Sequence, residues 1–200
     1  MSISIYTYKF NRMRNTLIVF ARKPQRGKVK TRLANTIGIE KAFSTYKQLL
    51  NNTLEIAKKA QAQLKVYWSE STNYTDGVIQ KGNDLGERMY NAFVSELNGE
   101  SKVCLLGSDV PYITVEIIDK SFEHLGTNDI VFGPSKDGGY YLVALKNSPP
   151  AELFLNKKWS HDKVLEDALE VCKRNNLKVH LMQTLLDIDT KEDYEEWTRS

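Results

Sequence analysis

Cysteine is scarce in this chain, which has only two in 200 residues, and no apolar run is long enough to span a membrane. Cys104 and Cys172 lie far apart in apolar-periodic segments, so we expect two small buried side chains rather than a disulfide or a metal site. The first fifteen residues lack the continuous apolar core and the cleavage site of a secretory signal. Together these absences predict a cytoplasmic globular protein.

Acidic residues are also missing from the start of the chain, where Glu40 is the first. The basic residues that precede it are Lys9, Arg12, Arg14, Arg22, Lys23, Arg26, Lys28, Lys30 and Arg32. A basic segment can bind nucleic acid or a phosphorylated small molecule, or it can be a solvated surface. We favour the solvated surface for residues 9–14 and a ligand for residues 23–32, because the second group directly follows a strand pattern. We therefore interpret residues 1–15 as an N-terminal extension and residues 16–200 as a single domain.

Short apolar runs alternate with segments of helical periodicity along the rest of the chain. The predicted strands are residues 16–21, 64–69, 102–107, 129–133, 140–145 and 177–183. The predicted helices are residues 40–60, 84–97, 114–125, 160–175 and 189–197, with Thr114 as one cap and Asp189 or Thr190 as another. This alternation predicts an α/β fold of three layers, α/β/α, around a mainly parallel sheet.

Ligands of such sheets bind beyond the carboxyl ends of the strands, so the loops there are the candidate site. The loop at residues 22–32 has neither a Walker phosphate loop, since Arg22 stands where a glycine is needed, nor a glycine-rich dinucleotide motif. It does place Lys28, Lys30 and Arg32 between a strand and a helix, a good seat for phosphate. A solvent-facing basic loop is the alternative.

Carboxylates follow two other apolar segments. Asp109 comes just after a buried strand, where it can hold Mg²⁺ or Mn²⁺ or can bond the backbone of the following turn. Asp187 and Asp189 flank Ile188, and alternate residues of an extended segment point the same way, so both can face one site. Helix capping by Asp189 is the alternative and is compatible with metal binding.

The segment "PSKDGGYYL" separates two predicted strands with the turn Lys136–Gly139. Its glycines would let a ligand approach the backbone, and Asp137 would accept from ligand hydroxyls or assist a metal. A tight connection between strands is the alternative. Of Tyr140 and Tyr141, we expect one ring to face the core and the other the cleft. His161, which precedes a helix, could reach an acceptor.

Five segments carry a resemblance to a known family. In order they are "LIVFARKPQRGKVKTRLA", "LGERM", "LLGSDVPYIT", "DIVFGPSKDGGYYLVAL" and "LLDIDTKEDYEEW". Together they resemble a glycosyltransferase-A-like (GT-A) family of the nucleotide-diphospho-sugar transferase superfamily, catalogued as radical-SAM/selenodomain-associated transferases of unproven activity. The resemblance implies that Asp109 matches the metal-binding Asp of that superfamily and that Asp189 is similar to the second metal-binding Asp of CMP-Kdo synthetase. The "KTRL" segment is similar to a basic segment of phospholactate guanylyltransferase.

The residues and the resemblance together lead to one prediction of function. We expect a transferase dependent on Mg²⁺ or Mn²⁺ that acts on a nucleotide-sugar or a nucleoside triphosphate, with glycosyl transfer favoured and nucleotidyl transfer as the alternative. Asp109 and Asp189 are the expected metal ligands. Catalytic roles are expected of Lys28, Lys30, Arg32 and Asp137, and substrate contacts of Ala21, Arg22, Gly27, Gly107, Ser108, Lys136, Gly138, Gly139 and Tyr140. A non-catalytic nucleotide- or nucleic-acid-binding module stays open, although the acidic clusters argue against a nucleic-acid groove.

Overall fold

A seven-stranded sheet forms the centre of the computed structural model, which describes residues 14–98 and 101–199. Its strands are β1 (Arg14–Ala21), β2 (Gln63–Trp68), β3 (Val78–Ile79), β4 (Ser101–Leu106), β5 (Ile130–Pro134), β6 (Tyr140–Leu145) and β7 (Val179–Leu181). Their order is β3-β2-β1-β4-β6-β5-β7. Only β6 runs antiparallel to its neighbours, within the part of the chain that the structure describes. The predicted mainly parallel sheet is confirmed.

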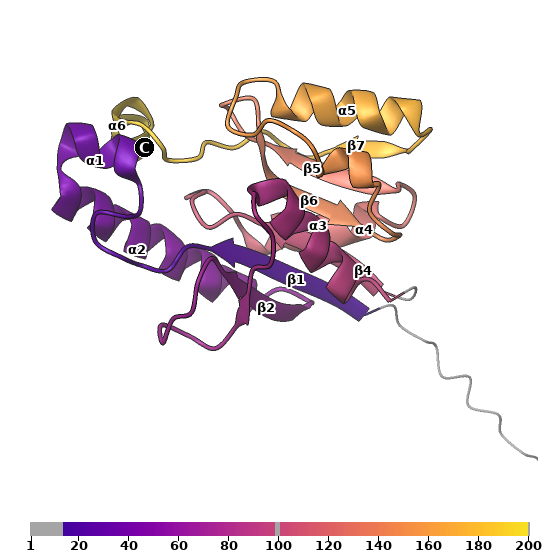
Figure 1. Ribbon diagram of the computed structural model, residues 1–200, viewed down its shortest axis with the longest axis horizontal. Coiled ribbons are helices and arrows are strands. Elements are labelled where there is room, and N and C mark those ends of the chain that lie inside the picture. Colours follow the sequence, from indigo (N-terminus) through magenta and orange to yellow (C-terminus); the bar gives the residue numbers. More distant parts are fainter. Residues whose placement is uncertain (1–13, 99–100, 200) are drawn as a thin grey trace, which may run out of the picture.

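Helices cover both faces of this sheet (Figure 1). They are α1 (Thr31–Ile37), α2 (Ile39–Ala57), α3 (Leu85–Glu96), α4 (Val115–His124), α5 (Val164–Arg174) and α6 (Lys191–Arg199), with a short 3₁₀ turn η1 (Ala151–Leu153). Tyr46 and Leu50 of α2 share one apolar core with Ile118 of α4, and Phe93 of α3 shares the other with Val171 of α5. The three-layer α/β/α architecture is therefore confirmed.

The helices α1 and α6 lie side by side at one end of the molecule (Figure 1). A third, smaller apolar cluster joins them to α2 and to the segment before α6; its buried members are Leu33, Ala42, Leu49, Leu186 and Ile188. Through Ile188 and Leu33, this cluster holds the segment that carries Asp187 and Asp189 against α1.

Side-chain caps set the start of several helices. Thr114 accepts a hydrogen bond from the backbone nitrogen of Ile117, as its predicted cap role requires. At α6, Thr190 accepts from the nitrogen of Asp193, and the Asp193 carboxylate accepts from the nitrogens of Asp189 and Thr190. This reciprocal capping box holds Asp189 at the rim of α6. Thr190 is thus the cap residue of the predicted pair.

Several boundaries differ from the sequence prediction. The helical pattern predicted from residue 40 is preceded by a separate short helix, α1, and Gly38, with a positive φ of 88°, separates it from α2. Helix α5 begins at Val164 instead of residue 160, since Ser160 adopts a left-handed conformation. The edge strand β3 has two exposed residues, so apolar burial gave no signal for it.

The cysteines and the apolar character of the helices can be compared with the sequence predictions. Cys104 and Cys172 are both free and buried, as predicted. In residues 14–98 and 101–199, no helix combines the length and the apolar character needed to cross a membrane. Of the predicted N-terminal extension, residues 1–13 lie outside the described part of the chain, and β1 already begins at Arg14.

Candidate active site at the carboxyl edge of the sheet

Asp109 and Asp189 converge at the carboxyl edge of the sheet. Strands β1 and β4 are parallel neighbours, with Val19 opposite Leu106, so the loops that follow them start side by side. The backbone nitrogen of Ile188 donates to the carbonyl oxygen of Asp109 at 3.1 Å, which ties the segment before α6 to the loop after β4. Three segments that are distant in the sequence therefore meet at one place.

Lys30 lies between the two aspartates. Its Nζ is 2.8 Å from Oδ2 of Asp109 and 2.9 Å from Oδ1 of Asp189, and only 3% of its side chain is exposed. Burial opposes the charge on this side chain, but the two carboxylates outweigh it and raise the pKa of Lys30 to about 12. The two aspartates thus converge as predicted, and the group between them is the Lys30 ammonium.

Arg32 supplies a second cation from the first turn of α1. Its guanidinium pairs with Oδ2 of Asp189, so both oxygens of that carboxylate contact a basic side chain. Burial alone would raise the pKa of Asp189, but Lys30 and then Arg32 hold it below its ordinary value. The negative charge of Asp189 is thus favoured by two cations, one buried and one, Arg32, with a side chain that is 66% exposed.

Asp187 faces the same region as Asp189, as the alternation around Ile188 suggests. Its burial, and next the negative charges of Asp137 and Asp109, raise the pKa of Asp187 to about 7. The turn after β5, the loop after β4 and the segment before α6 thus all bring carboxylates to one place.

Tyr46 organises the site from α2, and sequence reasoning missed it. Its hydroxyl donates to the carbonyl oxygen of Arg22 at 2.7 Å and accepts from the Arg22 nitrogen at 2.9 Å. Burial raises the pKa of Tyr46 to about 12, and the Ser108 hydroxyl, which also bonds it, opposes this increase. Tyr46 therefore connects the ends of β1 and β4. Its place on the apolar face of the helical pattern indicated a core residue only.

The turn at residues 136–139 packs against the chain itself. Asp137 accepts from the Ser135 hydroxyl at 2.5 Å and from the Gly139 nitrogen at 2.9 Å. Gly138 has a φ of 88°, and a Cβ placed there would lie 1.9 Å from the carbonyl oxygen of Asp162. The sequence predicts that a ligand approaches the backbone at Gly138. In the structure, the backbone of Asp162, in the segment before α5, makes that approach. Lys136 pairs with Glu196 of α6 at 2.5 Å.

The other residues predicted to contact the substrate lie at the ends of β1 and β4 and on the turn before α1. Ser108, Arg22 and Gly107 lie at the ends of β1 and β4, and a side chain on Gly107 would approach Oδ1 of Asp109 to 3.2 Å. The Ala21 carbonyl is taken by the nitrogen of Ser69 and by Gln80. Lys28 and Gly27 are exposed on the turn before α1. Their roles in substrate binding stay predictions.

The two tyrosines of β6 pack on opposite faces of the sheet, Tyr141 buried and Tyr140 half-buried. Tyr141 is buried in one core and donates to the carbonyl oxygen of Gln183, while Tyr140 packs between Phe132 and Trp159 at the other. The ring of Tyr141 thus faces the core as expected of one of the two, and Tyr140 is only partly buried, so its role in substrate binding stays a prediction.

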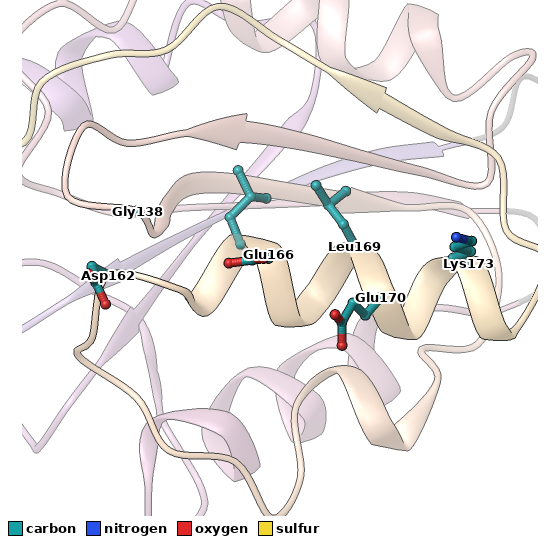
Figure 2. Close-up of a pocket in the computed structure, with 7 residues that line it drawn as sticks. Gly138, Asp162, Glu166, Leu169, Glu170 and Lys173 are labelled. Carbon is teal, nitrogen blue, oxygen red and sulfur yellow. The ribbon is translucent and has the colours of Figure 1, made fainter.

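A groove of about 470 Å³ runs along α5 beside the turn (Figure 2). Leu165 and Leu169 line it together with Gly138, Asp162, Glu166, Glu170 and Lys173. Among the predicted site residues, Gly138 alone takes part in the lining that the structure describes. His161, just before this groove, makes local contacts, with Nε2 3.0 Å from the carbonyl oxygen of Lys158.

The site residues match a hard divalent cation in their chemistry. Carboxylate oxygens are the ligands that Mg²⁺ and Mn²⁺ prefer, and Asp109 and Asp189 present them to one point, with Asp187 close by. Within residues 14–98 and 101–199, however, no group of three or more acidic, His or Cys side chains is already arranged as a metal site. The metal-ligand roles of Asp109 and Asp189 stay predictions.

Comparison with known proteins finds a matching family profile and similar solved structures. The profile of the family described as "Uncharacterized protein conserved in bacteria (DUF2064)" matches residues 43–161. A proposed nucleotide-diphospho-sugar transferase from Desulfovibrio desulfuricans G20 has a similar crystal structure, with 29% sequence identity and a TM-score of 0.85 over 92% of this chain and 86% of that one.

Two more distant structures share the fold. One is 4-diphosphocytidyl-2C-methyl-D-erythritol synthase from Anaerococcus prevotii DSM 20548, with 13% identity and a TM-score of 0.60 over 95% of this chain and 98% of that one. The other is Rv0371c from Mycobacterium tuberculosis H37Rv in complex with manganese, with 15% identity and a TM-score of 0.52 over 94% and 99% of the two chains. The predicted GT-A-like fold is confirmed, and the radical-SAM association stays a prediction.

Proposed function

The chain belongs to the bacterial family DUF2064, and from this premise we propose that it is a metal-dependent transferase acting on a nucleotide-sugar or a nucleoside triphosphate. The observation that carries the proposal is the meeting of Asp109, Asp189 and Lys30 at the carboxyl edge of β1 and β4. Open α/β sheets bind their ligands at that edge. Paired carboxylates beside basic side chains suit a substrate that brings phosphates together with a divalent cation.

Each group has a role in this proposal. Asp109 and Asp189 would hold Mg²⁺ or Mn²⁺, which when bound neutralises phosphate charge and orients the phosphates. Lys30 and Arg32 donate to phosphate oxygens and stabilise the negative charge that grows on the leaving group. Lys28 lies on the same loop and adds positive charge at its exposed end. Asp137 accepts from hydroxyl groups on the sugar or acceptor side.

Glycosyl transfer is the reaction that we favour. The leaving group is then a nucleoside diphosphate, and the sugar passes to an acceptor. Similarity to the protein named as a nucleotide-diphospho-sugar transferase supports this choice. Similarity to the cytidyl-type synthase supports the alternative, in which an acceptor phosphate attacks the α-phosphorus and pyrophosphate leaves. The manganese complex of Rv0371c supports Mn²⁺ as the first ion to test.

A thermal-shift panel of nucleotide-sugars and nucleoside triphosphates, with and without Mn²⁺, tests the proposal. With Mn²⁺ present, stabilisation by a nucleotide-sugar but not by triphosphates supports glycosyl transfer. Stabilisation by a triphosphate but not by nucleotide-sugars supports nucleotidyl transfer. Asp109→Ala should abolish the effect. Asp76→Ala is the matched control, because Asp76 is exposed beside a separate groove with Lys58 and Leu64. If no compound stabilises the protein while random oligonucleotides bind it with a steep salt dependence, the nucleic-acid alternative replaces this proposal.

A further inference from the structure

Lys30 holds its position through both its backbone and its side chain. The residue precedes α1 in the left-handed conformation, with φ 48° and ψ 45°, and its carbonyl oxygen accepts from the nitrogen of Ala34 at 2.8 Å. Left-handed backbone is uncommon for a residue with a side chain. This conformation directs the ammonium group inward, where it bonds Asp109 and Asp189 almost out of contact with solvent. Arg32, by contrast, reaches Asp189 from the exposed side.

The ammonium group and a divalent cation would compete for the same oxygens. Lys30 bonds Oδ2 of Asp109 and Oδ1 of Asp189 at 2.8 and 2.9 Å. A Mg²⁺ ion shared by these two oxygens would lie about 2.0–2.1 Å from each of them. Bound between them, it would take the place that the ammonium nitrogen of Lys30 now fills. Two positive charges at such a separation repel each other, most strongly where water is excluded. The cation and the Lys30 ammonium therefore cannot occupy this point together.

We propose that Lys30 is a resident counter-ion that keeps divalent cations out of the site until a phosphate-bearing substrate draws its ammonium group away from Asp109 and Asp189. The inference rests on the proposed function and adds an order of events to it. The lysine side chain has a flexible four-carbon stem, so the ammonium can change partners while the backbone stays in place. A phosphate group offers it new oxygens as the cation takes the carboxylates. Metal and substrate consequently bind together, and neither binds tightly alone.

Binding of Mn²⁺ without nucleotide tests this inference, measured by calorimetry on the purified full chain. Lys30→Met removes the competing charge, so its affinity for Mn²⁺ should exceed that of the wild type by on the order of 10- to 100-fold, the usual range for coupled sites. Lys30→Arg keeps a cation in place and should bind Mn²⁺ as weakly as the wild type. Lys65→Met, which removes from β2 the ion-pair partner of Glu96 in α3, is the matched control and should leave Mn²⁺ affinity unchanged. Equal Mn²⁺ affinity in Lys30→Met and the wild type overturns the inference.

Thermal stability provides a second measurement if Lys30→Met folds poorly. Mn²⁺ alone should raise the melting temperature of Lys30→Met far more than that of the wild type, because the ion replaces the missing charge between Asp109 and Asp189. Lys30→Met combined with Asp109→Asn should lose this gain. Stabilisation of equal size in the wild type and in Lys30→Met argues against the inference as directly as equal affinity does.

The wild type offers a further test through the coupling between ligands. Pyrophosphate should strengthen Mn²⁺ binding to the wild type and should lose this effect in Lys30→Met. Wild-type protein that binds Mn²⁺ equally tightly with and without pyrophosphate contradicts the inference. If nucleotides with Mn²⁺ stabilise the wild type but Lys30→Met gains no Mn²⁺ affinity, the Lys30 inference alone fails. If Lys30→Met gains affinity but no nucleotide binds, the proposed function alone fails.

Discussion

The backbone nitrogen of Ile188 donates a hydrogen bond to the carbonyl oxygen of Asp109, and this contact places Asp189 beside Asp109. Ile188 is fully buried in the cluster that joins α1, α2 and α6, so the segment cannot easily leave the loop after β4. The capping box at Thr190 fixes the other side of Asp189. Backbone contacts on both sides of Asp189 thus help to set the arrangement of the two carboxylates, together with their shared partner Lys30.

Breaking the buried ion pair should be costly for stability. Lys30→Met leaves Asp109 and Asp189 close together without their shared cation, so we expect a loss of about 2–3 kcal/mol in the free energy of unfolding. This is below the range for fully buried pairs, because the two aspartate side chains are about one-third exposed. Arg32→Met removes an exposed partner and should cost less than about 1 kcal/mol. Urea denaturation at neutral pH measures both, and equal losses would show that Lys30 is not the principal counter-ion.

Tyr46→Phe should weaken the scaffold of the site. The substitution removes the hydroxyl that bonds both backbone groups of Arg22, so we expect a destabilisation of about 1–3 kcal/mol. Tyr74→Phe is the matched control, since the Tyr74 hydroxyl bonds Asn51 at the surface and its loss should be nearly neutral. Denaturation curves for the two variants decide the point. A Tyr46→Phe protein as stable as Tyr74→Phe would mean that the Arg22 contact contributes nothing.

Gly138 and Gly27 separate two effects of adding a methyl group. Both have positive φ, so Ala costs about 1–2 kcal/mol of backbone strain at either position. At Gly138 the new Cβ also meets the Asp162 carbonyl, whereas among the described residues no atom beyond the chain neighbours lies within 4 Å of the Cβ at Gly27. Gly138→Ala should therefore be the more destabilising by at least about 1 kcal/mol. Similar melting temperatures for the two variants would contradict the packing of the turn on the segment before α5.

A histidine pair should make stability depend on pH. The rings of His124 in α4 and His180 in β7 stack with centroids 3.5 Å apart. Burial and then the neighbouring His124 lower the pKa of His180, so the unfolded chain binds the proton more readily than the folded one. The contribution of neutral His180 to the free energy of unfolding is therefore complete above the ordinary histidine pKa. It is lost as the pH falls through that value and then through the lower pKa of the folded state.

His180→Gln should therefore reduce the loss of stability between pH 7.5 and pH 5.5. His124→Gln should act in the same direction, because it removes the facing ring. Unfolding free energies of the wild type and both variants at the two pH values provide the measurement. If the wild type and the variants lose the same amount of stability on acidification, the pair has no such role.

Much of the fold follows from local sequence patterns. The apolar runs inside β1 and β4 are short and continuous, as strands buried on both faces should be. Thr114 and Thr190 stand before helical patterns and cap them. Asp109 could be found as a candidate because a carboxylate directly after a buried strand of an α/β sheet lies at its ligand-binding edge.

The contacts that organise the site could not be predicted in this way. Nothing local distinguishes Lys30 from Lys28, yet one side chain is buried between two aspartates from other loops and the other is exposed. Periodicity places Tyr46 in the core and gives no sign of its bonds to Arg22. The insertion of β6 between β4 and β5 depends on long-range pairing, which no local pattern reveals.

The central claim is that Asp109 and Asp189 act as one site for a metal and a nucleotide. Calorimetry with Mn²⁺ and the best nucleotide from the thermal-shift panel tests it most directly, on the wild type, Asp109→Asn, Asp189→Asn and the double variant. We predict that each single change weakens nucleotide binding by at least about tenfold and that the double variant is little worse than either, because both break the same site. Affinities that stay unchanged, or losses that simply add, would contradict the account.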